Sequence, residues 1–388
     1  MKILFIEWKS FGNEDMIDAY EESGYEVIRL PFERKDMRND VDFEKELSDS
    51  IRQHSPSYVF SFNYFPIVSK VCKKEDITYV SWIYDSPYVL LYSYTTINPC
   101  NVIFVFDKEL CMEFQKAGIK TVHYLPMAAN TKRLDSMTDT AAFENSIWKN
   151  EASIAFIGSM YTEKHLFYER LEGISPYTRG YLEAIIAAQR KVYGYNFIQE
   201  VLPAPIIEDM QKVLPMEPHA DGVESVEYLY AQYVINRHIT GLERMDFLKA
   251  ITAHHALDLY TPDQSFFMPN VFNHGPVDYY DMAPYVFKKA LINLNISLRS
   301  IKSGIPLRAF DILGAGGFLL SNYQSDFLDF FTPDEDFIYF DSEADMLHKI
   351  DYYLAHEDER AAIARNGHAR IAAAHTYLHR IKEIETYL

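Results

Sequence analysis

The chain has 388 residues, with 37 Lys and Arg against 56 Asp and Glu, and a formal net charge of −19 at pH 7. This charge repels a phosphate backbone or an anionic membrane surface unless a local basic patch overrides it, and no Lys/Arg cluster stands out in the sequence. Hydrophobic residues make up 48% of the chain, so large cores can be buried, and the length fits two domains. We therefore expect a globular protein with no nucleic-acid partner.

The first residues, MKILFIEW, form an apolar run too short for a secretory signal, and they indicate a buried strand. No run approaches about 18 apolar residues, so no transmembrane segment is predicted. Cys72, Cys100 and Cys111 form neither a CxxC pair nor a zinc-like spacing, which favours free thiols in a reducing compartment. The cytoplasm is the expected location.

Strand and helix patterns alternate through the first third of the chain. The predicted strands are nearly continuous apolar runs, and they lie at 2–8, 25–30, 58–63, 77–85, 101–106 and 120–128. Such runs, separated by amphipathic helices, are typical of a parallel sheet covered on both faces. We predict a Rossmann-like domain over 1–135.

A polar linker is expected over 136–150, before a second α/β domain over 151–370. That domain opens with the strand SIAFIGSMY, carries a helical insertion at about 163–250, and returns to strand–helix alternation at ALDLYT. Residues 371–388 are predicted to form a C-terminal helix that packs back on the first domain.

The stretch SGIPLRAFDILGAGGFLLSN, residues 303–322, is the strongest candidate for a binding site. It predicts a short helix over LRAFDILG, with Pro306 in its first turn and Gly314 and Gly316 ending it. The helix begins beyond a strand, where free N–H groups and the helix dipole favour an anion such as a pyrophosphate, and Arg308 can add a charge-assisted contact. The alternative is a solvated ion pair between Arg308 and Asp311.

A second candidate follows the first strand of the second domain, where Gly158 and Ser159 allow a ligand to approach and Lys164 can meet a phosphate. A plain turn with a surface lysine is the alternative. In HGPVDYY, which begins at His274, a tight turn and aromatic rings can stack on a base or sugar, although 29 tyrosines make a chance grouping common.

Asp85 follows the apolar strand of WIYDSPY in the first domain. A carboxylate at this position can accept a proton from an attacking hydroxyl, or it can cap the next helix, which is the commoner use of Asp before a turn. His254 and His255 lack a third ligand at a suitable spacing, and the acidic loop TPDEDF shows no DxD arrangement at a strand end. No metal site is predicted.

Two long segments resemble the spore-maturation-protein (CgeB-like) glycosyltransferases. The run INLNISLRSIKSGIPLRAFDILGAGGFLLSNY and the residues after it, to HTYLHRI, are similar to the carboxyl-terminal domain of that family. WIYDSP and IFVFDKELCMEFQKAGIKTVHYLPMAAN resemble its amino-terminal domain. The resemblance covers nearly the whole chain and is weakest in the helical insertion.

The resemblance implies a GT-B fold, in which two Rossmann-like domains face each other, the second binding a nucleotide-activated sugar and the first presenting the acceptor. SGIPLRAFD aligns with a segment where related enzymes carry two glutamates separated by seven residues. Ser303 and Asp311 stand at those positions here, so the sugar-recognition role and the retaining mechanism linked to that motif are both in question.

These observations predict a metal-independent glycosyltransferase that uses a nucleotide-sugar donor, by analogy a UDP-sugar, and a hydroxyl of a glycan, protein or cell-surface acceptor. The donor diphosphate is expected at Arg308, at Lys164 and along 303–307, comprising Ser303, Gly304, Ile305, Pro306 and Leu307. Asp85 is the expected base. A non-catalytic sugar-nucleotide or glycan-binding protein and a sugar-nucleotide epimerase or hydrolase are the alternatives, and a homodimer is left open.

Overall fold

The computed structural model describes residues 1–34, 36–138, 152–162 and 167–388. The chain divides into two compact units. Unit 1 consists of Met1–Ala129, Pro218–Glu224 and His375–Leu388, and unit 2 of Asn130–Glu217 and Ser225–Ala374. The sequence-based division, by comparison, ended the first domain at 135 and kept 218–224 in the helical insertion. Most of the expected linker at 136–150 lies outside the described residues.

Unit 1 is built on a six-stranded parallel sheet with the order β2-β1-β3-β4-β5-β6. Its strands are β1 (Lys2–Glu7), β2 (Glu26–Pro31), β3 (Tyr58–Phe62), β4 (Tyr79–Ile83), β5 (Asn101–Val105) and β6 (Val122–Tyr124). Every residue of β3 and β4 is buried, as expected for central strands covered on both faces. The sequence pattern had predicted all six strands.

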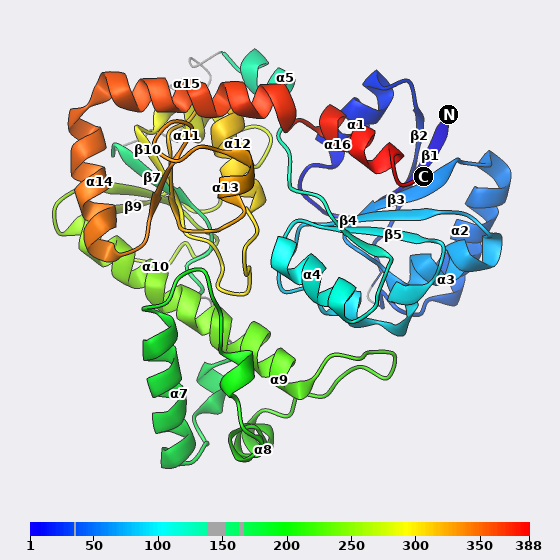
Figure 1. Ribbon diagram of the computed structural model, residues 1–388, viewed down its shortest axis with the longest axis horizontal. Helices are drawn as coiled ribbons and strands as arrows, with labels where there is room; N and C mark the ends of the chain where they lie inside the picture. The colour runs from blue at the N-terminus through cyan, green and yellow to red at the C-terminus, as the bar shows by residue number, and fades with distance from the viewer. Residues whose placement is uncertain (35, 139–151, 163–166) are drawn as a thin grey trace. The chain divides into compact units, whose positions relative to one another are not determined.

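Helices cover both faces of this sheet (Figure 1). They are α1 (Asn13–Glu22), α2 (Val41–His54), α3 (Pro66–Glu75), α4 (Lys108–Lys116) and α16 (Tyr377–Glu385), with 3-10 turns η1 (Val89–Tyr92) and η2 (Tyr94–Ile97). The apolar faces of α2, α3 and α4 share one core with the strands, whereas α16 packs against α1. The C-terminal helix is therefore part of unit 1.

Unit 2 has a second six-stranded parallel sheet, with the order β12-β11-β10-β7-β8-β9. Its strands are β7 (Ile154–Ile157), β8 (Leu257–Tyr260), β9 (Val271–Asn273), β10 (Ile292–Asn295), β11 (Leu319–Asn322) and β12 (Ile338–Phe340). Its helices are α5 (Thr131–Ser136), α10 (Asn236–Thr252), α11 (Ala283–Lys289), α12 (Leu307–Gly314), α13 (Phe327–Phe330), α14 (Glu343–Ala355) and α15 (Glu357–Ala374). Two parallel sheets with covering helices confirm the predicted α/β class.

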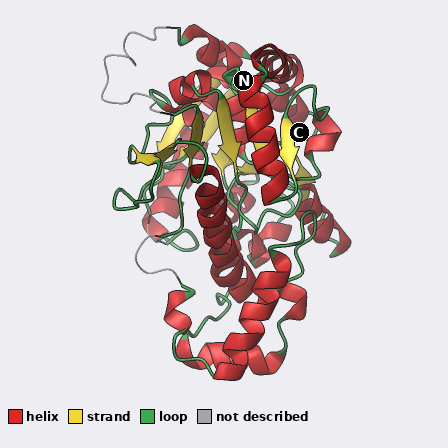
Figure 2. Ribbon diagram, turned by 90° about the vertical axis from the view of Figure 1, so that its left-hand side faces the viewer, coloured by secondary structure: helices red, strands yellow, loops and turns green. Residues whose placement is uncertain are grey.

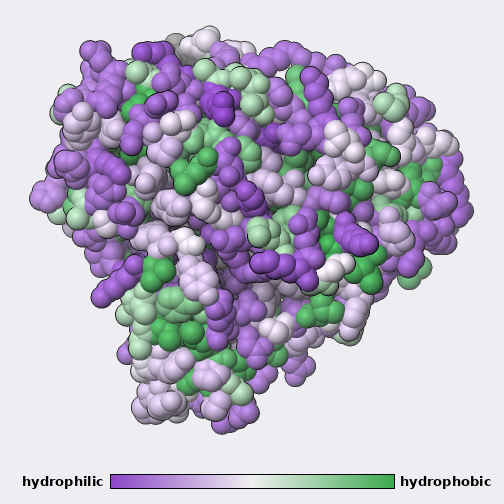
Figure 3. Space-filling model, viewed as in Figure 1, coloured by the Kyte–Doolittle hydropathy of each residue, from purple (hydrophilic) through white to green (hydrophobic). Residues whose placement is uncertain are grey.

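The helical insertion has a core of its own. It contains α7 (Pro176–Gln189), α8 (Ala204–Val213), α9 (Val226–Leu229), the π-helical turn η5 (Tyr230–Ile235), and the 3-10 turns η3 (Glu169–Leu171) and η4 (Gln199–Val201). Figures 1 and 2 show α7 and its neighbours extending away from the strands of unit 2. Their buried apolar side chains pack on one another and on the start of α10. Hydrophobic residues also gather on the surface of this part (Figure 3).

Helix α12 is held in place by close backbone packing. Its residues Ala309, Phe310, Ile312 and Leu313 are buried, and it lies against α15. Gly367 of α15 allows this approach, since a Cβ there would lie 2.7 Å from Leu313 Cδ2 and 2.4 Å from the Asp336 carbonyl oxygen. Helix α12 is thus packed closely on α15.

No helix among the described residues is long and apolar enough to cross a membrane. All three cysteines are free thiols, and Cys72 and Cys111 are buried.

Candidate functional site

Gly158, which directly follows β7, lies against Arg308 in the first turn of α12. A Cβ added to Gly158 would be 3.1 Å from Arg308 Nη1, so any larger residue would press on the guanidinium here. The guanidinium also lies over the Phe156 ring, 5.2 Å from its centroid. Two segments that the sequence analysis had treated separately therefore meet at the carboxyl end of β7, where ligands bind in such sheets.

Arg308 has a guanidinium nitrogen without a hydrogen-bond acceptor among the described residues. Its Nη1 is buried and has no hydrogen-bond partner in the described chain. Burial, followed by repulsion from Arg244, lowers the pKa of the Arg308 guanidinium to about 9, which leaves it protonated at neutral pH. A buried guanidinium nitrogen without a hydrogen-bond acceptor is costly, and a bound anion would supply that acceptor.

Two further arginines, both from α10, contact the loop that follows β7. Arg244 donates to the Ser159 carbonyl at 2.5 Å and to the Ile296 carbonyl at 2.6 Å, and its guanidinium lies 5.0 Å from the Tyr161 ring centroid. Arg237 lies over the same ring at 5.7 Å. Sequence reasoning missed both, although their spacing of two helical turns places them on one face of α10. Arg244 shapes the loop and adds positive charge beside Arg308.

The loop after β7 has a defined conformation. Tyr161 adopts a left-handed backbone with φ 53°, and its N–H donates to Ser159 Oγ at 2.9 Å. Gly241 of α10 lies beneath it, since a Cβ there would be 3.4 Å from Tyr161 Cβ. Ser159 is therefore part of a structured turn beside the arginines. Lys164, the other residue predicted here, lies outside the described residues.

The segment from Ser303 to Leu307 leads directly into α12. Pro306 is the N-cap residue, one position before the first turn in which the sequence pattern had placed it, and it makes no side-chain capping hydrogen bond. Ser303 and Ile305 are buried, and the Ser303 carbonyl accepts a hydrogen bond from the Asp326 N–H at 3.1 Å. With Gly304 and Leu307, these residues bring the start of α12 beside Gly158. Its first N–H groups therefore receive no hydrogen bond from the side chain of the N-cap residue.

Asp311 does not form the local ion pair with Arg308 that was the alternative reading. Its carboxylate accepts a hydrogen bond from the Tyr279 hydroxyl at 3.1 Å. Tyr279 belongs to the loop after β9, and Arg133 lies over the rings of Tyr279 and Tyr280 at 6.0 and 5.1 Å. Asp311 thus joins α12 to the HGPVDYY loop.

His274, at the start of that loop, is fixed by the sheet. Its Nε2 lies 2.8 Å from Oδ1 of the buried Asp258 on β8, and its ring stacks on Tyr260 with centroids 4.7 Å apart. The polar edge of the imidazole is therefore engaged within the fold, which favours a supporting role over direct ligand contact.

Asp85 lies in unit 1, after β4, and it does not cap a helix. Its Oδ2 accepts a hydrogen bond from Asn63 Nδ2 at 2.6 Å. Burial raises the pKa of the Asp85 carboxyl, and the hydrogen bond from Asn63 opposes that rise. Sequence reasoning missed Asn63, which directly follows the neighbouring strand β3.

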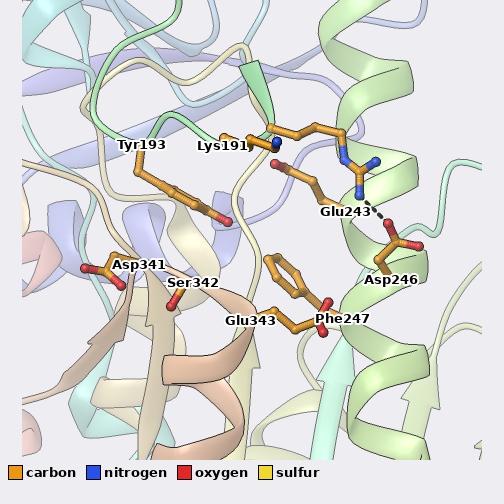
Figure 4. A pocket seen from close by; sticks show the side chains of 9 residues that line it. Lys191, Tyr193, Glu243, Asp246, Phe247, Asp341, Ser342 and Glu343 are labelled. Carbon is orange, nitrogen blue, oxygen red and sulfur yellow. Dashed lines mark hydrogen bonds and ion pairs between the residues drawn. The ribbon is translucent and has the colours of Figure 1, made fainter. Parts of the chain in front are cut away.

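A separate recess of about 300 Å³ occurs in unit 2, between α10 and the start of α14 (Figure 4). Its charges are largely paired, because Arg190 bonds to Asp246, and Glu243 to Arg299 at 2.5 Å. Asp341 and Glu343 make the rest of its lining mainly acidic. It is thus less suited to a diphosphate than the Arg308 site. Within the described ranges, no group of three or more His, Cys, Asp or Glu side chains is placed to hold a metal ion.

Comparisons with known proteins agree with this geometry. Residues 237–386 match a family model described as glycosyl transferase-like. Solved structures with the same fold include Anabaena HepE in complex with UDP-glucose (TM-score 0.54, 9% identity, covering 100% of both chains) and sucrose-phosphate synthase from Thermosynechococcus elongatus (0.53, 11%, 100% of this chain and 98% of that one). A glycosyltransferase from Rickettsia africae is also similar (0.51, 9%, 100% and 97%). Comparison with curated protein sequences finds no match.

These likenesses confirm the GT-B fold, and the matched domain identifies the protein as an enzyme of the glycosyltransferase class. The narrower resemblance to the CgeB-like family stays a prediction.

Proposed function

We propose that the protein transfers a sugar from a nucleoside-diphosphate sugar, with UDP as the nucleotide, to an acceptor hydroxyl. The observation that carries the proposal is Nη1 of Arg308, which has no partner among the described residues and lies against Gly158 at the start of α12, where the N-cap residue makes no side-chain hydrogen bond. A diphosphate would supply the missing acceptor oxygens for both the guanidinium and the helix N–H groups. The printed complex of the structurally similar HepE with UDP-glucose supports UDP as the nucleotide.

In the proposed reaction, the acceptor oxygen forms a bond to the anomeric carbon while the bond from that carbon to the diphosphate oxygen breaks. Arg308 and the α12 N-terminus stabilise the negative charge that develops on the departing diphosphate, a role that a divalent cation has in other enzymes. Asp85 accepts the proton of the acceptor hydroxyl. The acceptor is proposed to be a glycan or protein, and the free thiols favour the cytoplasm.

A thermal-shift screen against UDP, GDP, ADP, CMP, TDP and common UDP- and GDP-sugars tests the donor. A ligand that binds only the folded state raises the melting temperature, so we expect UDP and a UDP-sugar to do so with EDTA present. The absence of any shift at millimolar concentration would contradict the donor site.

Product analysis then separates the possible activities. Incubation with the identified sugar nucleotide and a panel of glycan and protein acceptors is expected to give a glycosylated acceptor and free UDP. A new sugar nucleotide would indicate an epimerase, and free sugar alone a hydrolase. Binding without any product would favour a non-catalytic protein, which is the reading that Ser303, in place of glutamate, makes worth testing.

A further inference from the structure

The carboxyl ends of β3 and β4 hold two polar side chains in one arrangement. The strands are parallel neighbours with Phe62 opposite Trp82, so the residues that follow them, Asn63 and Asp85, meet at one edge of the sheet. Asn63 Nδ2 donates to Asp85 Oδ2 at 2.6 Å. Its Oδ1 accepts from the backbone N–H groups of Tyr84 at 3.1 Å and of Asp85 at 3.4 Å. The asparagine amide therefore contacts both the carboxylate and the backbone that carries it.

Asn63 itself is firmly held. It is buried and has a left-handed backbone with φ 57°, a conformation that asparagine tolerates better than most residues. Its N–H donates to the Trp82 carbonyl at 2.9 Å, and its own carbonyl accepts from Ser61 Oγ at 2.6 Å. The side-chain amide consequently has a fixed position from which to orient Asp85.

The surroundings of Asn63 and Asp85 explain why the hydrogen bond between them affects the ionisation of Asp85. Burial raises the pKa of the Asp85 carboxyl, and the only opposing influence comes from the Asn63 hydrogen bond; no charged side chain of the described residues contributes. The residues beside the pair are aromatic: Tyr84 stacks on Trp8 of the β1 end, with ring centroids 6.2 Å apart. A hydrogen bond to the charged form favours that form.

We propose that Asn63 is the positioning residue of Asp85, which keeps this carboxylate in one orientation and ionised so that it can accept the proton of the acceptor hydroxyl. The inference rests on the proposed function for its catalytic consequence. The coupling of Asn63 to the titration of Asp85 is a property of unit 1 alone and can be measured without any substrate.

Asn63→Gly is the appropriate variant, because glycine keeps the left-handed backbone and removes only the amide. Asn270→Gly is the matched control. Asn270 is also left-handed, with φ 60°, and its Nδ2 donates to the Thr252 carbonyl at 2.8 Å, so the control makes the same substitution, with loss of a side-chain hydrogen bond, at an exposed position in unit 2. A cooperative thermal unfolding transition in each variant would show that both are folded.

The first measurement is the infrared carbonyl band of protonated Asp85, isolated by subtracting the spectrum of the same protein carrying Asp85→Asn. In Asn63→Gly the titration of this band should move to higher pH by about half a unit or more, and in Asn270→Gly it should not move. An unchanged titration in Asn63→Gly would overturn the proposal.

The second measurement is the pH dependence of UDP release from UDP-glucose in the presence of the panel of glycan and protein acceptors. The acid limb of kcat/KM should move upward with the infrared titration in Asn63→Gly, and the plateau should fall about tenfold as the carboxylate loses its orientation. A shifted infrared titration with an unmoved acid limb would overturn the role of Asp85 as base, and with it the catalytic consequence of Asn63. A lack of UDP release by the unaltered protein would count against the proposed function, while the infrared result would still decide the coupling.

Discussion

Arg308 is costly to the folded chain, because its Nη1 is buried with no hydrogen-bond partner in the part of the chain that the structure describes, and because Arg244 repels it. We therefore expect Arg308→Met to weaken UDP binding about tenfold to hundredfold, the range for a charge-assisted hydrogen bond, and to raise the melting temperature of the ligand-free protein. Calorimetric titration with UDP and thermal unfolding measure the two effects. Arg365→Ala, which alters an exposed arginine of α15, should change neither. Weaker binding together with lower stability would indicate a structural arginine instead.

The raised pKa of Asp85 predicts how the stability of the protein changes with pH. The pKa of Asp85 is raised in the folded state, so the unfolded state loses this proton first as the pH rises. Above the pKa of the unfolded state, near 3.9, the ionised Asp85 therefore lowers the stability of the fold. Asp85→Asn keeps an oxygen to accept from Asn63 but cannot ionise. Its melting temperature should exceed that of the unaltered protein by about 2 °C at pH 7, and the difference should shrink toward pH 4. A constant difference across this range would contradict the assignment.

At the residue scale, the sequence predicted those residues whose role depends only on the local course of the backbone. Gly158 and Arg308 stand at a strand end and a helix start, and both positions follow from the local pattern. Arg244 and Asn63 were missed, because their roles depend on partners 85 and 22 residues away in the chain. No local pattern shows which oxygen a side chain will reach.

Among the elements, α12 and α15 show how glycine permits close approach. Gly367→Ala would place a Cβ 2.4 Å from the Asp336 carbonyl oxygen, which cannot move cheaply, so we expect a loss of about 1–3 kcal/mol of stability and weaker UDP binding as α12 shifts. Gly180→Ala in α7 is the matched control, since nothing lies within 4 Å of the added Cβ. It should stabilise the protein by about 0.5–1 kcal/mol. Denaturant unfolding measures both changes, and effects of the same sign would contradict the packing argument.

The elements themselves were largely predictable, because buried strands and amphipathic helices carry strong periodic signals. The ends of the helices and strands were less predictable. Pro306 precedes α12 as its N-cap, and of the two glycines expected to end the helix with positive φ, only Gly316 has it, at 77°. The local sequence allows Pro306 either as the N-cap or in the first helical turn, and the packing of α12 on its neighbours selects the N-cap position.

For the whole molecule, the division into units is the feature that local sequence signals describe least. Unit 1 is assembled from three separate segments, and the short segment Pro218–Glu224 lies within the predicted insertion. It is held by contacts such as the ion pair of Asp221 with Arg38 and the hydrogen bond of the Tyr94 N–H to the Asp221 carbonyl at 2.8 Å. These partners are more than 100 residues apart, so a pass along the chain cannot join them.

The C-terminal segment of unit 1 depends on Arg380 of α16. This arginine is 1% exposed, and its guanidinium donates to the Pro126 carbonyl at 2.8 Å and to the Met127 carbonyl at 3.0 Å, while Nη1 bonds to Glu383 at 2.6 Å. Arg380→Ala would leave those buried carbonyls without donors and open a cavity beneath α16. We expect a loss of about 3 kcal/mol of stability, because removing one partner of a buried charged network costs more than the network contributes.

Hydrogen exchange locates this effect within the molecule. In Arg380→Ala, amide protection should fall in α16, in α1, against which α16 packs, and around Met127, while α12 and the sheet of unit 2 keep theirs. Lys382→Ala alters an exposed side chain of the same helix and should leave all protection unchanged. Equal losses in both units after Arg380→Ala would show that they unfold as one body, whereas a loss confined to unit 1 is what its separate core requires.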